Sequence, residues 1–264
     1  MQDPVSPHTT AVTETITSPL VQYVLHLADN ALVAGHRNSE WTGHGPVLEQ
    51  DIAISNIALD LIGQARNFYQ YAARLLGGNT NEDNLAFHRN APEFRNLLLV
   101  EMEKGDWAFT TLRQFFFSAY QYFLFGQLKD SRDETLAAIA AKSLKEVQYH
   151  LRWSSEWVIR LGDGTTESKQ RIENALQQLA PYLNELVENA EYEKTLAANQ
   201  IAVDASSIKK MLEEKIQSIL EEATLVMPSV KAISGGKSGR HSHQLEAMLL
   251  EMQVLQRAYP DSNW

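Results

Sequence analysis

The chain has 264 residues, of which 44% are hydrophobic and 21% charged, a balance typical of a globular protein with a large core. Its 23 basic and 33 acidic residues give a formal charge of -10, which argues against a nucleic-acid binder or a protein held on anionic lipid. The absence of cysteine excludes disulfides, thiolate zinc sites, iron–sulfur clusters and cysteine nucleophiles. The absence of cysteine also fits a cytoplasmic protein, and no apolar run is long enough to span a membrane.

The N-terminal half combines a polar start with two long helical patterns. Residues 1–17 are rich in threonine and lack a signal-peptide pattern, so we expect a flexible tail. Apolar residues at helical spacing predict a first helix over residues 18–34, followed by a Gly/Pro-rich elbow that ends at Pro46. A second helix is predicted over residues 48–76, with Gly77 and Gly78 ending it.

The rest of the chain continues the helical periodicity. A short helix is predicted near residues 94–100 and a long, strongly aromatic helix over residues 106–129. Ser131 and Glu134 have the spacing of a capping box, which predicts the start of a fourth long helix that ends near Leu161. Further helices are predicted over residues 166–186, 206–224 and 243–258. We therefore expect an all-α fold, with one ferritin-like domain over residues 18–264: a four-helix bundle with additional helices.

A bundle of this type can hold two iron ions, and it then needs Glu-x-x-His on two helices, because residues three apart share one face. None of the eight histidines follows an acidic residue at that spacing. The nearest matches, Glu40 with His44 and Glu146 with His150, are one residue too long. The sequence therefore predicts a metalloenzyme scaffold that has lost its metal site.

The positions of the degenerate site follow from helical geometry. On the second helix, Asp60 and Gly63 keep the ligand spacing with glycine in place of histidine; the polar side of this helix carries Asn56, Asp60, Gly63, Gln64 and Asn67. Gln121 on the third helix is neutral and a poor iron ligand. On the fourth helix, His150 falls at the edge of the apolar stripe, Glu146 a little beyond it and Tyr149 further away. The Glu146–His150 pair is able to bind one metal ion or simply to form hydrogen bonds, and we predict no metal and no catalytic residue in this chain.

Two loops carry basic residues. The glycine-rich segment 234–243 fails as a phosphate-binding P-loop, because Lys231 stands where the first glycine is needed and no strand precedes it. Its glycines either expose N–H groups to an anion or form a tight connection before the last helix. In segment 88–95, a nucleotide could stack on Phe94 with its phosphate near Arg95, or the charges are ordinary loop charges.

Several separated segments agree with one known family. They are LDLIGQARNF at 59–68, NLLLVE at 96–101, KEVQYHLR at 145–152, and GGKSGRH at 235–241 followed by EMQVLQR at 251–257. In this order they resemble the C subunit of bacterial phenylacetyl-CoA epoxidase, a multicomponent monooxygenase. The resemblance runs from about residue 20 to Trp264 and leaves only the N-terminal extension outside it.

The resemblance implies that this chain is a subunit that does not itself catalyse the reaction. In that family the A subunit holds the di-iron site and epoxidises the aromatic ring of phenylacetyl-CoA, while the C subunit pairs with it as a related, non-catalytic partner. Partners are therefore expected to be the A subunit, other members of the complex and phenylacetyl-CoA near the interface, without nucleic acid or membrane. The resemblance implies these candidate substrate contacts, with the loop 235–241 behind them: Pro92, Glu93, Phe94, Arg95 and Lys194.

Two rival functions stay open. The first is a self-sufficient di-iron or single-metal oxidase with non-standard ligands, which are Glu40, Asp60, Glu146 and His150. The missing second histidine ligand argues against it. The second rival is a stand-alone acyl-CoA binding module, which requires tight CoA binding without any partner.

Overall fold

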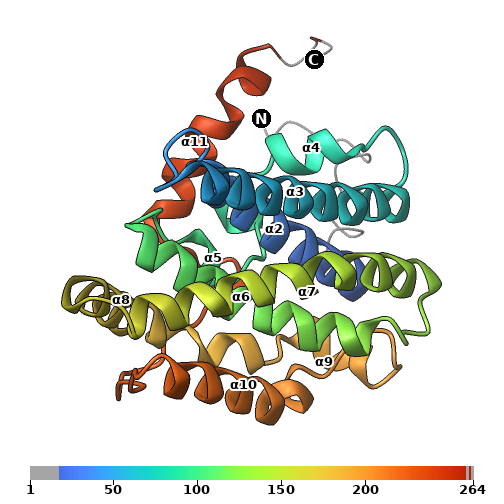
Figure 1. The fold of residues 1–264 in the computed structure, drawn as a ribbon. Coiled ribbons are helices and arrows are strands. Elements are labelled where there is room, and N and C mark those ends of the chain that lie inside the picture. Colours follow the sequence, from blue (N-terminus) through green and yellow to red (C-terminus); the bar gives the residue numbers. More distant parts are fainter. Residues whose placement is uncertain (1–17, 260–261, 263–264) are drawn as a thin grey trace.

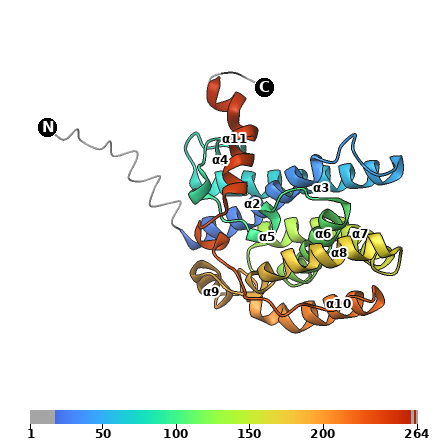
Figure 2. The same ribbon diagram turned by 90° about the vertical axis from the view of Figure 1, so that its left-hand side faces the viewer.

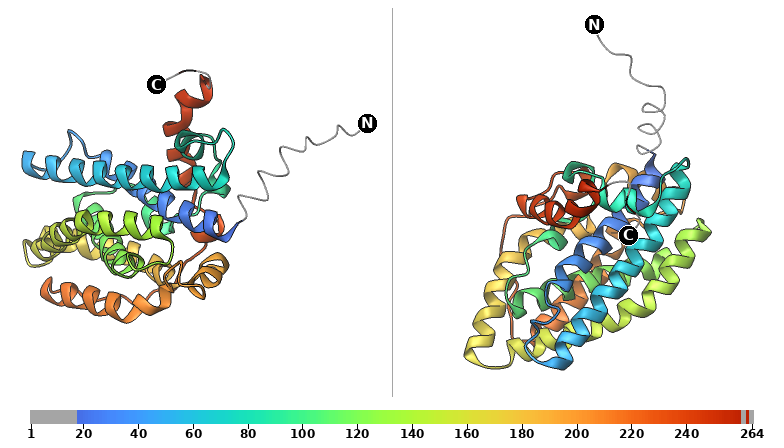
Figure 3. Two further views of the ribbon diagram at one scale, coloured as in Figure 1. Left: turned by 90° about the vertical axis from the view of Figure 1, so that its right-hand side faces the viewer. Right: turned by 90° about the horizontal axis from the view of Figure 1, so that it is seen from above.

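Four long helices form the centre of the computed structural model, which describes residues 18–259 and 262. They are α2 (Pro19–Ser39), α3 (Leu48–Leu76), α6 (Trp107–Leu128) and α7 (Glu134–Gly162). α2 packs along α3, and α6 packs along α7, so the bundle consists of two helical hairpins (Figures 1 and 3). This arrangement confirms the predicted all-α, ferritin-like four-helix bundle with additional helices.

The additional helices cover the bundle on one side and extend it at one end. α8 (Thr166–Leu179) and α10 (Lys209–Glu222) pack against α6 and α7, while α9 (Glu191–Ala197) packs against α2. α9 and α10 form a third layer below the two hairpins, and α8 runs beside the α6–α7 hairpin (Figures 1 and 2). α11 (His243–Ala258) contacts α4 and projects from the body (Figure 2). The short elements are α4 (Glu82–Phe87), α5 (Leu98–Glu101) and the 3₁₀ turns η1 (Ala91–Glu93), η2 (Ala180–Tyr182), η3 (Asn184–Val187), η4 (Ala205–Ile208) and η5 (Gly236–Ser238).

α2 is longer than its apolar pattern predicts. It continues five residues beyond Ala34 and ends at Ser39. Polar side chains hold this extension inside the protein: Arg37 donates to the Glu101 carbonyl at 3.0 Å, and Asn38 donates to Gln114 of α6 at 2.6 Å. Tertiary hydrogen bonds therefore extend the helix where hydrophobic periodicity stops.

The start of α7 differs from the prediction. The cap residue is Asp133, whose carboxylate accepts the Leu136 N–H at 2.9 Å, so the predicted Ser131 capping box is wrong. Ser131 instead donates its hydroxyl to the Ile201 carbonyl at 2.6 Å, which ties the α6–α7 connection to the third layer. Further along the chain, Pro181 ends the predicted helix 166–186 early, and α8 stops at Leu179.

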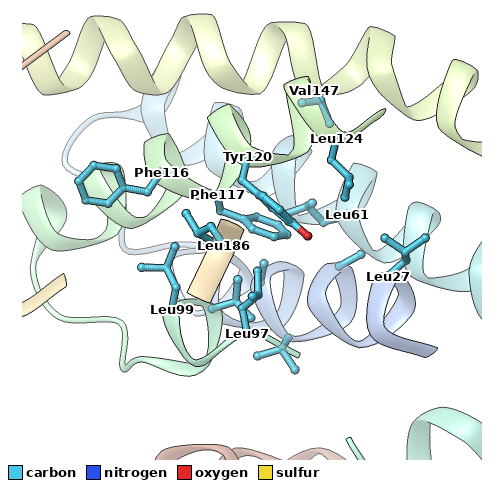
Figure 4. Close-up of a cluster of buried hydrophobic side chains, with 14 of the residues drawn as sticks. Leu27, Leu61, Leu97, Leu99, Phe116, Phe117, Tyr120, Leu124, Val147 and Leu186 are labelled. Carbon is cyan, nitrogen blue, oxygen red and sulfur yellow. The ribbon is translucent and has the colours of Figure 1, made fainter. Parts of the chain in front are cut away.

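The core lies around α6, because this helix runs between the α2–α3 hairpin and the third layer (Figure 3). Five of its aromatic side chains are buried; Figure 4 shows Phe116, Phe117 and Tyr120 among leucines from several elements. Each such ring stabilises the fold by roughly 1.5–3 kcal/mol relative to an exposed position. The described residues contain no strand. None of their helices is both long enough and apolar enough to cross a membrane.

Candidate functional site

Five polar side chains from α3, α6 and α7 meet inside the bundle; we refer to them as the central polar cluster. Asp60 binds His150, with 3.0 Å between Oδ2 and Nε2. Gln64 donates to Glu146 at 2.9 Å, and Gln121 donates to Gln64 at 3.3 Å. The structure thus brings together four of the five positions that the sequence assigned to the degenerate site, leaves Tyr149 out and adds Gln64.

Gln64 is the residue that sequence reasoning misplaced. The pattern of α3 put it on the polar side of the helix, yet its side chain is buried and links α6 to α7. Asp60, one turn earlier, keeps a side chain that is 39% exposed. Tyr149 stays out of the cluster: it is 38% exposed, and its ring meets the His150 ring edge-on. One residue along a helix turns the side chain by about 100°, which explains why His150 points inward and Tyr149 does not.

The donor set of the central polar cluster does not fit two iron ions. Ferritin-like di-iron sites use four carboxylates and two imidazoles on four helices. The cluster offers two carboxylates, one imidazole and two neutral amides, and its Gln64 amide donates a hydrogen bond to the Glu146 carboxylate. Across residues 18–259 and 262, no three Asp, Glu or His side chains are grouped so that they could hold a metal ion.

α2 carries a separate buried network that the sequence pattern did not reveal. Asp29 accepts hydrogen bonds from the Tyr69 hydroxyl at 2.6 Å, from Arg89 at 3.1 Å and from the Arg95 backbone N–H at 2.8 Å. His26, three residues earlier on the same face, donates from Nδ1 to the Arg95 carbonyl at 2.7 Å. Burial lowers the pKa of His26 to about 4, so its imidazole is neutral at pH 7. The polar residues at 26, 29 and 30, within an otherwise apolar helix, are the sequence signal that could have indicated this network.

The glycine-rich loop is clamped by buried acids. Glu185 accepts the N–H groups of Gly235 at 2.8 Å and Gly236 at 2.7 Å, so these two amides are not available to an external anion. Lys237 lies inside the protein, where its ammonium binds Glu193 at 3.0 Å. A tight, internally satisfied connection is therefore the better interpretation of this segment than an anion cradle.

His241 holds the other end of the loop through two hydrogen bonds. Its Nδ1 lies 2.8 Å from the Glu101 carboxylate, and its Nε2 lies 3.0 Å from the Phe94 carbonyl. Gly239 has a left-handed φ of 80°, and a Cβ there would stand 2.3 Å from the Pro92 carbonyl oxygen. Only glycine can be accommodated at this position, because any side chain would collide with Pro92. The loop therefore lies directly against segment 90–95.

Three of the predicted substrate contacts, Glu93, Phe94 and Arg95, make contacts within the protein. Phe94 is fully buried and lies under the Arg89 guanidinium, 4.2 Å from its ring centroid, so the predicted stacking of a nucleotide on Phe94 is wrong. Glu93 caps its own turn by accepting the Asn90 N–H at 2.7 Å. The Arg95 guanidinium donates to the Pro92 carbonyl at 2.8 Å.

Lys194 belongs to a different element. It lies on α9, where its exposed ammonium pairs with Glu191 at 2.6 Å. Pro92, in contrast, lines a surface cleft of about 700 Å³ between η1, the glycine-rich loop and α11, which we call the α11 cleft. Its lining residues are Asn90, Ala91, Pro92, Gly239, Arg240, His241, Ser242, His243, Glu246, Leu249, Leu250, Gln253 and Arg257.

Fold and site together define a ferritin-like helical bundle with a cluster of two carboxylates, one imidazole and two amides between α3, α6 and α7. The chain matches the phenylacetic acid catabolic protein family over residues 1–264 and belongs to this family. It is 46% identical, over 246 residues, to the C subunit of the 1,2-phenylacetyl-CoA epoxidase of Escherichia coli (strain K12). That alignment covers 93% of this chain and 99% of the relative, which confirms the resemblance seen in the sequence segments.

Proposed function

We propose that this chain is a non-catalytic structural and interface subunit of a phenylacetyl-CoA 1,2-epoxidase complex in aerobic phenylacetate breakdown. The Escherichia coli relative aligns with nearly the whole chain, and its name makes it one of several subunits of an epoxidase. In this proposal the di-iron centre and the chemistry lie in the catalytic A subunit. The role of this chain is to bury a helical face against that partner and to rigidify the helices that present its metal ligands.

The observation that carries the proposal is the central polar cluster. Gln64 and Gln121 occupy the space between α3, α6 and α7 with neutral amides, and Asp60 and Glu146 already have hydrogen-bond partners. Hard cations such as iron prefer carboxylate oxygen over amide groups. The cluster is therefore evidence for a bundle whose helices are linked by hydrogen bonds and not by a metal ion.

The outer face of α3 is the surface that we propose for the catalytic partner. Leu48, Ile52, Leu59 and Ile62 are 71%, 51%, 66% and 41% exposed, and their spacing puts them on one side of the helix. Apolar side chains gathered on one exposed helix face are typical of a protein–protein interface. Asp60, which lies next to Leu59, would be covered by the same partner.

We further propose that the segment around Pro92 contributes to the surface that holds the CoA part of the substrate. The first rival function, a self-sufficient oxidase, is disfavoured because Glu40 pairs with Arg37 at 2.8 Å at the end of α2 and takes no part in the central polar cluster. The stand-alone acyl-CoA module predicts CoA binding to the isolated chain that is as tight as binding to the full complex.

Metal content tests the proposal directly. The chain is purified alone and together with a co-expressed catalytic partner, and iron is measured by mass spectrometry alongside oxygen-dependent turnover of phenylacetyl-CoA. We expect iron and turnover only in the complex. Roughly two irons per isolated chain with turnover would overturn the proposal. As a matched control, E146A in this chain should leave the iron content of the complex unchanged.

A further inference from the structure

α11 has two faces with opposite surroundings. One face packs on the body of the protein through four buried side chains, which are Leu245, Met248, Leu249 and Gln253. The opposite face is exposed and carries a row of apolar residues, which we call the α11 stripe: Ala247, Leu250, Val254 and Ala258. Leu250 is 69% exposed and Val254 is 57% exposed. Each residue turns a helix by about 100°, so the four side chains fall within about 80° of one another, which is the narrow seam of a helix pair.

Two opposite charges border the α11 stripe on the same flank. Glu246 and Arg257 are eleven residues apart, which is about three turns, so their side chains leave the helix within about 20° of each other and about 16 Å apart. Both side chains are exposed, and within the described part of the chain neither forms an ion pair. The Arg257 guanidinium donates to the Arg89 carbonyl at 3.0 Å and to Asn90 Oδ1 at 3.1 Å. Both acceptors are neutral, so they hold the guanidinium in place and leave its charge unpaired.

We propose that α11 pairs with the α11 of a second copy of this chain, antiparallel about a two-fold axis at the level of Met252. Leu250 and Val254 lie two residues on either side of that level, so the axis packs Leu250 of each copy on Val254 of the other. It likewise brings the two alanines of the stripe, Ala247 and Ala258, together at both ends of the contact, where small side chains let the helices approach closely. This inference goes beyond the proposed function and does not rest on it, because the outer face of α3 is the surface assigned to the catalytic partner.

The flanking charges select this pairing over the alternatives. In an antiparallel pair, each flank of one helix meets the same flank of the other, so Glu246 of one copy lies beside Arg257 of the second copy, twice in each pair. A parallel pair would instead bring Glu246 beside Glu246 and Arg257 beside Arg257. An unrelated partner would have to supply both the apolar row and the reversed charges. A second copy already carries both, because the stripe is its own complement.

The pairing should be weak in the isolated chain. α11 is a helix of 16 residues that projects from the body, so a second helix can lie along it (Figure 2). One pair of such helices buries an area at the small end of protein interfaces, below about 1,200 Å². Glu251, on the other flank and close to the axis, would face its own copy and lower the affinity further. We therefore expect a dissociation constant of about 10–100 µM.

Analytical ultracentrifugation of the full-length chain at about 1–200 µM tests the proposal through a charge exchange. We expect a monomer–dimer equilibrium that E246R and R257E each weaken by at least about tenfold, because each places like charges together twice. The double variant E246R/R257E should recover the wild-type affinity within about threefold, since the same pairs form with their signs exchanged. L250K should abolish dimerisation. V226K is the matched control: Val226 is 85% exposed and lies outside α11, so this variant should dimerise like the wild type.

Three results would overturn the proposal. The first is a chain that stays monomeric up to about 200 µM. The second is a double variant that keeps the helical circular dichroism of the wild type but dimerises no better than the single variants. The third is L250K that still dimerises like V226K while it loses co-purification with the catalytic partner, which would assign the α11 stripe to that partner. The iron measurement is independent of all these results, so failure of the pairing leaves the proposed non-catalytic role intact.

Discussion

The clamp on the glycine-rich loop gives the sharpest stability prediction. Glu185 is 2% exposed, and its carboxylate accepts three backbone N–H groups: Gly235 at 2.8 Å, Gly236 at 2.7 Å and Leu98 at 2.8 Å. One side chain thus joins η3, the start of α5 and the loop that borders the α11 cleft. We expect Glu185→Ala to destabilise the fold strongly, because it leaves all three buried N–H groups without an acceptor.

The magnitude follows from the number of orphaned donors. A buried backbone N–H without a partner costs about 1–3 kcal/mol, so three of them set an upper range of about 3–9 kcal/mol. Water entering the vacated space satisfies part of this loss, and we expect a cost in the lower part of the range, about 3–5 kcal/mol. A typical domain is stable by about 5–15 kcal/mol, so the variant should fold only marginally at 25 °C.

Urea denaturation followed by circular dichroism measures this loss. Glu188→Ala is the matched control: Glu188 is a neighbouring acid whose carboxylate binds the exposed Asn184 side chain, and we expect a change below about 0.5 kcal/mol. Glu185→Gln should lie between the two, because the amide keeps an oxygen acceptor but points an N–H group at another donor. A loss of less than about 1 kcal/mol in Glu185→Ala would refute the reasoning that these three hydrogen bonds hold the loop.

Three further predictions concern other parts of the molecule. The pKa of His26 is about 4 in the folded chain and about 6.5 when unfolded, so the unfolded state binds more protons between these values. Stability should therefore fall by about 3 kcal/mol as the pH drops from 7 to 4, and chemical denaturation at several pH values should show a smaller fall in H26N. Asp29→Asn should cost about 3–5 kcal/mol in the same assay, because it leaves the Arg89 guanidinium buried without its counter-ion. The double variant L59K/I62K should unfold like the wild type, within about 0.5 kcal/mol, but should lose co-purification with the catalytic partner; retained co-purification would exclude this α3 face as the interface.

The long helices could be predicted from the sequence because their apolar residues recur at helical spacing. Periodicity fails as a guide where side-chain hydrogen bonds replace apolar packing. α2 continues to Ser39 through the contacts of Arg37 and Asn38, which no hydrophobic pattern contains. The start of α7 was misplaced for a related reason: Ser131 and Asp133 are both good cap residues, and only the tertiary bond from Ser131 to Ile201 decides between them.

Only part of the membership of the candidate site could be predicted from the sequence. Helical geometry indicated that Asp60, Gln121, Glu146 and His150 lie at similar positions along their helices, and the structure brings them together. The role of Gln64 was not predictable, because a polar residue beside an apolar stripe looks the same whether it meets solvent or a neighbouring helix. The stacking predicted for Phe94 failed because Arg89, five residues earlier, covers its ring.

The central polar cluster links the helices of the bundle through hydrogen bonds between side chains of α3, α6 and α7. Carboxylates that point between helices need a positive charge or hydrogen-bond donors, since burying them unpaired is costly. Gln64 supplies a donor to Glu146, and His150 pairs with Asp60 across the α3–α7 contact. Neutral amides and one imidazole thus link the same helices that a metal pair would link. Under the proposed function, this arrangement keeps the shape of the bundle that an interface subunit needs without the ligands that catalysis needs.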